Sequence, residues 1–206
     1  MKMLIGIVVG IVVIIAAVFI FSPRAPEDVQ QASITDSPEG SMNAENGAMV
    51  GDGDQSMIAI TSFGFVGYGP GKSHTGTFNS YEITNVAVNE AGLPTSGTIT
   101  FAVDSLSTDT EILTGHLTEK KEFFDSATYP TIAFTLTDIT DAEAGTFQVN
   151  GDLTIKGVTK RIGFAVQGQA DKTFTSEFRV DMSQFGFAAP GIVDNEVLIN
   201  FSGNLF

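Results

Sequence analysis

Apolar and polar residues alternate with a period of two along most of the chain after residue 55. Because a β-strand sends successive side chains to opposite faces, such runs are typical of strands with one buried face. Turn signals such as Ala144-Gly145 and Lys156-Gly157 separate the runs. The pattern predicts eight antiparallel strands, with apolar positions at Ile58 and Ile60; Ile83 and Val86; Ile99, Phe101 and Val103; Ile132, Phe134 and Leu136; Phe147, Val149, Leu153 and Ile155; Ile162, Phe164 and Val166; Phe174, Phe178 and Val180; and Val197, Ile199 and Phe201.

One segment of this region has a helical spacing instead. Residues 117–126 place Leu117, Lys120, Lys121 and Phe124 on positions compatible with one helix. Tyr129-Pro130 follows, and a residue before proline is pushed out of the α region, which ends the helix. The sequence therefore predicts an all-β domain with a single short helix.

Eight strands that share an apolar face must hide that face and their unpaired edges, which a barrel or a sandwich achieves. An eight-stranded barrel encloses a lumen that is filled by side chains or holds one small ligand. Fifteen of the 17 phenylalanines follow residue 55, and they suit a long apolar ligand and plain packing equally well. The candidate lumen residues are Ile58, Ile60, Phe78, Ile99, Phe101, Val103, Phe123, Phe124, Phe134, Leu136, Ile155, Phe164, Phe178 and Phe201.

The N-terminus is apolar in a different way, because Met3–Phe21 contains no charged side chain. Nineteen helical residues rise roughly 28 Å, about the thickness of a bilayer's hydrocarbon core. This is longer than the apolar part of a cleaved signal, usually about 7–15 residues. We therefore expect residues 1–22 to be a transmembrane anchor, with a cleaved signal as the alternative. Lys2 before the span favours an N-terminus inside and a domain outside the cytoplasm.

Residues 23–54 are rich in Ser, Gly, Asn, Ala, Pro and acidic residues and contain no aromatic residue. Such a composition buries too little apolar surface to offset the entropy lost on ordering. The segment is predicted to be a flexible, disordered acidic linker. Residues 55–206 then remain as one domain of ordinary size.

The net charge and the absence of cysteine exclude several classes of function and site. The formal net charge is −14, which argues against nucleic-acid binding and against adhesion to anionic lipid through basic patches. With no cysteine, disulfides and thiolate zinc sites are excluded, while the redox compartment stays open.

No arrangement typical of a catalytic or metal site occurs along the chain. His74 and His116 are the only histidines, and neither belongs to a metal-binding or nucleophile motif. We interpret His74 as a loop residue and His116 as a polar cap or anchor of the helix. Gly71-Lys72-Ser73 invites comparison with a phosphate-binding loop, but the first glycine of that motif is replaced by Val66.

Several stretches carry a family resemblance. Phe123-Phe124-Asp125 followed by Tyr129-Pro130, the segment Val149–Lys160 (VNGDLTIKGVTK) and Arg179–Gly186 (RVDMSQFG) resemble motifs of the YceI-like, polyisoprenoid-binding domains. The resemblance covers about 55–206. It implies an eight-stranded lipocalin-like barrel with a small helix at its mouth.

The same resemblance implies a function. It points to a protein outside the cytoplasm that carries or sequesters an isoprenoid chain or a quinone-like lipid, with Phe123 and Phe124 gating the mouth. Together with the expected anchor at residues 1–22, this gives a membrane-tethered lipid-binding protein. No cofactor, metal or enzymatic activity is expected. Two alternatives remain open, a ligand-free structural domain at the cell surface and a lipid-modifying enzyme that uses His116.

The sequence departs from the family pattern at two places. The segment Ser62–Lys72 is richer in glycine than the family's opening strand, and Thr114 stands where the family has a charged pair. The polar end of the lumen is therefore expected to differ from that of the family.

Overall fold

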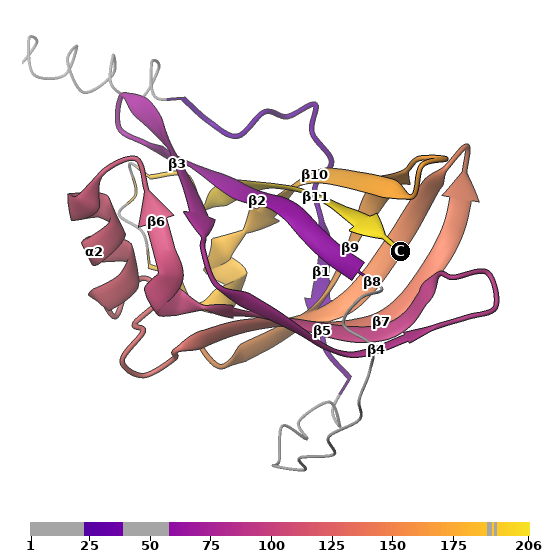
Figure 1. Ribbon diagram of the computed structural model, residues 1–206. Coiled ribbons are helices and arrows are strands. Elements are labelled where there is room, and N and C mark those ends of the chain that lie inside the picture. Colours follow the sequence, from indigo (N-terminus) through magenta and orange to yellow (C-terminus); the bar gives the residue numbers. More distant parts are fainter. Residues whose placement is uncertain (1–22, 39–57, 189–190, 192) are drawn as a thin grey trace, which may run out of the picture.

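The computed structural model describes residues 23–38, 58–188, 191 and 193–206, which form a curled antiparallel sheet with one short helix (Figure 1). The helix α2 spans Glu111–Glu119, between the 3₁₀ turns η1 (Val103–Ser105) and η2 (Met182–Phe185). The strands are β1 (Ser33–Asp36), β2 (Ile58–Gly69), β3 (Lys72–Phe78), β4 (Tyr81–Val88), β5 (Pro94–Ala102), β6 (Leu106–Thr108), β7 (Thr131–Glu143), β8 (Thr146–Ile155), β9 (Val158–Gly168), β10 (Thr173–Asp181) and β11 (Glu196–Leu205).

The sheet order is β4-β5-β7-β8-β9-β10-β11-β2-β3-β6, and β1 pairs with β9 off this path. The sheet therefore has eleven strands in its described part, and the predicted number of eight was wrong. The additional strands β1, β3 and β6 are short, and their residues show little apolar alternation. In β3 the inward positions are His74, Gly76 and Phe78, so a single large apolar residue marks the buried face.

Helix α2 lies at one end of the curled sheet, and the hairpins joining β4 to β5 and β7 to β8 lie at the other (Figure 1). The helix occupies Glu111–Glu119 rather than the predicted 117–126. Thr110 caps it by accepting a 3.4 Å hydrogen bond from the Leu113 amide, and Lys120 is already extended. The lysines and Phe124 match a helical spacing by chance, and the Thr110 cap was the overlooked signal.

The segment 23–38 differs from the flexible linker that its composition predicts. Strands β9 and β10 pair with each other only where Gln167 and Gly168 meet Phe174 and Thr175. Beyond that point they diverge, and the segment enters the gap. Its strand β1 pairs with β9, while the Ala32 amide donates to the carbonyl of Arg179 on β10 at 2.9 Å. This wedge, defined as residues 29–37, thus completes the wall of the sheet.

Side-chain contacts hold the wedge in addition to its backbone hydrogen bonds. Ala32 is 3% exposed and belongs to the apolar core. The Ser37 hydroxyl donates to Asp152 at 2.9 Å, and the Lys160 ammonium donates to Asp36 at 2.6 Å. The open edges of two strands provide hydrogen-bond partners that composition alone does not reveal, which explains why a polar, acidic segment is ordered here.

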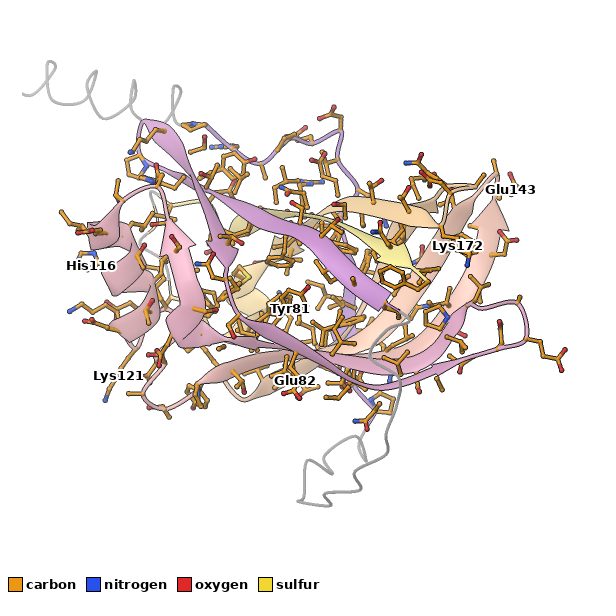
Figure 2. All side chains as sticks on the ribbon, viewed as in Figure 1. Tyr81, Glu82, His116, Lys121, Glu143 and Lys172 are labelled. Atoms are coloured by element: carbon orange, nitrogen blue, oxygen red, sulfur yellow. The ribbon has the colours of Figure 1, made fainter. Side chains whose placement is uncertain are left out.

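The sheet curls until β4 approaches β2, but no backbone pairing joins them. Backbone pairing between β3 and the second edge of β2 extends only along Phe65–Gly69, and the Thr77 hydroxyl of β3 donates to the Phe63 carbonyl at 2.8 Å. Along Ile58–Gly64 this edge faces β4 without backbone pairing within the described part of the chain. One side chain bridges the two strands, because the Tyr81 hydroxyl donates to the Ile60 carbonyl at 2.7 Å (Figure 2). We call this boundary between Ile58–Gly64 and β4 the seam. The structure is therefore an open barrel.

Helices that could cross a membrane are not found in the described ranges. The predicted anchor at 1–22 and the remaining part of the predicted linker, 39–54, lie outside the described residues.

Candidate functional site

A cavity of about 860 Å³ runs through the interior of the barrel. Its lining extends from Leu113 and Leu117 of α2 to Phe174, Leu205 and Phe206 at the opposite end. Most of the lining side chains are Phe, Ile, Leu or Val. Ligand pockets in proteins measure about 300–1,000 Å³, so this volume suits a sizeable apolar molecule.

The structure brings nearly all of the predicted lumen residues together on this cavity. Whether they contact a ligand stays a prediction. The predicted residues on the lining are Ile58, Ile60, Phe78, Ile99, Phe101, Phe123, Phe124, Phe134, Leu136, Ile155, Phe164, Phe178 and Phe201.

Val103 is the exception, and its placement on the lumen was wrong. The alternation Ile99, Phe101, Val103 assumes one continuous strand, but β5 ends at Ala102. Val103 opens the turn η1, is 1% exposed and packs into the core without lining the cavity. Its role is therefore structural.

Two loops close the barrel at the α2 end. The loop after α2 and the loop after η2 are joined where the Ala188 amide donates to the Glu122 carbonyl at 3.1 Å. The rings of Phe124 and Phe187 meet edge to face at 5.0 Å between centroids. Together these contacts cover the cavity with aromatic side chains.

Lys156, on the β8–β9 hairpin, holds the two loops that cover the α2 end of the cavity. Its ammonium donates to the Lys121 carbonyl at 2.7 Å and to the Gly186 carbonyl at 3.2 Å, one from each loop. It also lies 5.3 Å from the centroid of the Phe187 ring, which favours a cation in that position. A single charged side chain thus holds both loops and an aromatic ring.

Phenylalanines shape the middle of the cavity. Phe164 and Phe178 stack at 4.2 Å between centroids with their planes 10° apart, and Phe201 meets Phe164 edge to face at 6.0 Å. Phe134 joins the same cluster from β7. These rings leave a lumen with flat apolar walls, which is suited to a flexible hydrocarbon chain.

The opposite end of the cavity is bordered by the hairpins. Phe206 is 68% exposed there, and the amide of the preceding Leu205 donates to the carbonyl of Lys172 on the β9–β10 turn at 2.9 Å. Figure 2 labels Lys172 at this end. In the described part of the chain, no pair of loops covers this end as two loops cover the α2 end.

The helix contains His116 in its last turn, and only His74 lies elsewhere than predicted. His116 is exposed on α2 and does not line the cavity (Figure 2). The enzymatic alternative that required His116 in the lumen therefore loses its basis. His74 belongs to β3 rather than to a loop, and it does line the cavity.

Asp109 holds His74 from outside the lumen. Its Nδ1 lies 2.8 Å from Asp109 Oδ1, and the Lys72 ammonium lies 3.6 Å from Asp109 Oδ2. The hydrogen bond from His74 holds the pKa of Asp109 below its usual range, with a smaller contribution from the charge of Lys72.

Charged groups are also built into the wall around the wedge. Arg161 Nε donates to the buried Asp152 at 2.6 Å, which raises the pKa of the guanidinium. Burial raises the pKa of Glu196, whose carboxylate lies 3.5 Å from Arg179. Among the described residues, no group of three or more potential ligands is arranged to hold a metal ion.

Sequence reasoning missed several lining residues. Phe63 and Phe65 alternate as strand residues should, but the neighbouring glycines masked the pattern. Leu113 lies four residues before Leu117 and just after the Thr110 cap, a spacing that could have located the helix. Phe187 follows a left-handed Gly186 in a loop and offered no signal.

The fold and cavity define a class of protein, an all-β open barrel around an apolar lumen. Residues 51–205 match the family model of the YceI-like domain, and the chain belongs to that family. No match was found among curated proteins.

Solved structures share the fold at low sequence identity. BcnA of Burkholderia cenocepacia is 24% identical, with a TM-score of 0.60, over 68% of this chain and 93% of its own. The YceI protein of Campylobacter jejuni is 21% identical, with a TM-score of 0.51, over 64% of this chain and 84% of its own. A polyisoprenoid-binding domain from Saccharophagus degradans, implicated in plant cell wall breakdown, is 14% identical, with a TM-score of 0.53, over 74% of this chain and 100% of its own.

Proposed function

We propose that the protein holds the chain of an isoprenoid or quinone-like lipid in its lumen, for transport, storage or sequestration. The observation that carries this proposal is the apolar cavity of about 860 Å³, closed by aromatic side chains at the α2 end. The polyisoprenoid binding of the Saccharophagus domain agrees with it.

The energetics favour a long hydrocarbon. Each CH₂ group removed from water contributes about 0.8 kcal/mol, so a chain of several isoprene units gains enough to offset the cost of being ordered. The rings of Phe164, Phe178 and Phe201 offer flat surfaces rather than polar partners. Recognition along the chain is therefore by shape and apolarity, and it tolerates different chain lengths.

We further propose that residues 1–22 anchor the protein in a membrane, with the barrel outside the cytoplasm. The uncharged segment Met3–Phe21 and the position of Lys2 before it support this arrangement. A protease added to intact cells is expected to digest the barrel once the outer barrier is permeabilised. A barrel that resists until the cytoplasmic membrane is broken would contradict this location.

The binding proposal is tested by extracting lipid from the purified full chain and identifying it by mass spectrometry. The decisive variant is Gly97→Phe, because Gly97 lines the cavity and an added Cβ meets only the Val86 side chain, at 3.8 Å. The new ring takes up part of the lumen, and its Cβ meets no backbone atom within 4 Å, so less lipid is expected to be bound while the fold is kept.

The matched control is Gly115→Phe, which adds the same ring on α2 at a position that does not line the cavity. It is expected to retain as much lipid as the wild type. Equal amounts of lipid in the wild type and in Gly97→Phe, with both proteins folded, would mean that the lipid is not held in the lumen. The ligand-free structural domain would then be the better description.

A further inference from the structure

A histidine lines the mainly apolar cavity near its α2 end. On β3 the side chain of Phe78 is buried in the core, and Gly76 lies against the ring of Phe65 inside the barrel. Because alternate residues of a strand share a face, His74 points to the same interior. Its presence among the lining residues agrees with this direction.

Space for a ligand lies next to this imidazole. His74 pairs across the hairpin with Gly67, and both residues line the cavity together with Gly69. A Cβ added to Gly67 would meet no atom within 4 Å. The two glycines thus leave open volume beside the histidine, which larger side chains at these positions would fill.

Asp109 determines which nitrogen of the His74 imidazole donates a hydrogen bond and which accepts one. An ionised carboxylate only accepts hydrogen bonds, so His74 Nδ1, at 2.8 Å from Asp109 Oδ1, carries the proton. Asp109 is itself anchored, since its amide donates to the Thr75 carbonyl at 3.1 Å. In the neutral imidazole, Nε2 is then left as a hydrogen-bond acceptor.

This acceptor has no partner within the described residues. We propose that His74, oriented by Asp109, binds the hydroxyl end of the lipid, as found in a prenol or in the hydroquinone form of a prenylated quinone. The inference rests on the proposed function and adds to it the chemistry of the ligand's polar end. His74 would be a binding residue, and Asp109 a positioning residue.

A diphosphate end fits this site less well. Lys72 is close enough to help bind an anion, but Asp109 lies between it and His74 and offsets their charge. The chain as a whole carries a net charge of −14. Asp194, another lining residue, accepts hydrogen bonds from the backbone amides of Ala25 and Glu196, so it adds negative charge without offering a donor.

The test compares three probes of equal chain length on the delipidated full chain: geranylgeraniol, its methyl ether and geranylgeranyl diphosphate. Binding is measured at about pH 9, where a histidine side chain is ordinarily neutral, by displacement of a fluorescent polyene. We expect the alcohol to bind about three- to tenfold more tightly than the ether, because only the alcohol can donate to His74 Nε2. The diphosphate is expected to bind no more tightly than the alcohol.

Variants then assign the preference to His74. His74→Leu is expected to bind alcohol and ether with equal affinity, and His74→Gln to restore part of the preference through its amide oxygen. Asp109→Asn should weaken the preference, because an amide also stabilises the other tautomer. His116→Leu, at the exposed histidine of α2, is the matched control and should behave as the wild type. Since the probes partition differently into detergent, the readout is the ratio of alcohol to ether affinity in each variant relative to the wild type.

The outcomes separate the two proposals. If neither alcohol nor ether binds the wild type, the lipid-binding function fails, and the inference with it. If both bind equally, or if the preference persists in a folded His74→Leu variant, the function stands and the role of His74 is overturned. Tightest binding of the diphosphate would likewise overturn it in favour of an anion site.

Discussion

The wall of the barrel is interrupted at two places, and they are repaired in different ways. Between β9 and β10 the wedge supplies a strand, backbone hydrogen bonds on both sides and a buried alanine. At the seam between β2 and β4, one side-chain hydrogen bond from Tyr81 to the Ile60 carbonyl is the bridge that the described residues provide. The wedge fills the first interruption with a paired strand, whereas a single side-chain hydrogen bond crosses the second.

The difference indicates where the barrel opens most easily. Separation at the wedge would break several hydrogen bonds and the Lys160–Asp36 ion pair, and it would uncover the core around Ala32. Separation at the seam breaks one hydrogen bond, with a net cost of about 0.5–1.5 kcal/mol, and parts the rings of Phe63 and Phe101, whose centroids lie 4.6 Å apart. The cavity lining includes Ile58, Ile60, Ile83 and Val86 from both sides of the seam. We therefore expect the wedge to determine stability and the seam to determine how fast a lipid enters and leaves.

The largest effect is expected from Ala32→Glu. This change places a carboxylate at a position that is 3% exposed within the apolar core. An unpaired buried charge is costly, so the free energy of unfolding should fall by about 3 kcal/mol or more, unless the wedge detaches first. Urea unfolding measures the loss, and hydrogen exchange at the β1 amides reveals detachment. Thr35→Glu, at an exposed position of the same strand, is the control and should cost less than about 0.5 kcal/mol.

The second prediction is a stabilising change at the same interruption. Ser33 and Gly163 are paired between β1 and β9, and a Cβ built on Gly163 lies 2.7 Å from Ser33 Oγ. The same Cβ lies 2.6 Å from Asn150 Oδ1, so the Asn150 side chain has to move aside in the variant. Ser33→Cys with Gly163→Cys should therefore form a disulfide in a chain that has no other cysteine. It closes a long loop, so unfolding should cost about 2–4 kcal/mol more than in the reduced form.

The crosslinked protein also sharpens the comparison of the two interruptions. If lipid passes through the seam, oxidation of this pair should leave the rate of lipid release unchanged. A slower release that is restored by reductant would instead locate the passage at the wedge. The reduced double variant is the internal control, because it differs from the oxidised protein by one covalent bond.

The wedge also marks the limit of what the sequence predicts. Alternation located the strands that carry large apolar residues, and thirteen of the fourteen candidate lumen residues line the cavity. Alternation reveals a strand that buries its own apolar side chains. Strand β1 is ordered instead because it supplies hydrogen-bond partners to the open edges of β9 and β10. That requirement arises only after the sheet has folded, so a composition such as that of residues 29–37 could not reveal it.

The same reasoning applies to the candidate polar site. His74 was interpreted as a loop residue, and the glycines of Ser62–Lys72 gave no strand signal, because glycine and histidine are poor markers of a buried strand face. The hairpin turn at Pro70-Gly71 aligns them, and Asp109 reaches His74 from a distant part of the sequence. A contact between residues 35 positions apart is set by topology rather than by local pattern.

A smaller effect on stability, with a larger effect on exchange, is expected from Tyr81→Phe. The change keeps the ring beside Phe101 and removes the hydrogen bond to the Ile60 carbonyl. The free energy of unfolding should fall by about 0.5–1.5 kcal/mol, while release of a bound fluorescent polyene should become severalfold faster. Tyr129→Phe is the control, since the Tyr129 hydroxyl makes no hydrogen bond with the described residues. Unchanged release from a folded Tyr81→Phe variant would remove the seam as the passage.

The smallest effect concerns the pH dependence of the wedge. Glu196 pairs with Arg179, whose Nε also donates to the Val29 carbonyl of the wedge at 3.0 Å. Burial raises the pKa of Glu196 above its ordinary value of 4.5, so the folded state binds this proton more tightly than the unfolded state does. The stabilisation from that proton is complete at low pH and is lost as the pH rises through the raised pKa.

Glu196→Gln imitates the protonated carboxyl at every pH and therefore isolates this effect. The variant should match the wild type near pH 4 and become more stable above the raised pKa, by less than about 1 kcal/mol because the side chain is partly exposed and paired. Urea unfolding of both proteins at several values between about pH 4 and pH 8 measures the difference, in which the contributions of Asp36 and Asp109 cancel. A variant that is less stable than the wild type at neutral pH would show that the ion pair with Arg179 outweighs the cost of burial, and that the charge of Glu196 helps to hold the wedge in the wall.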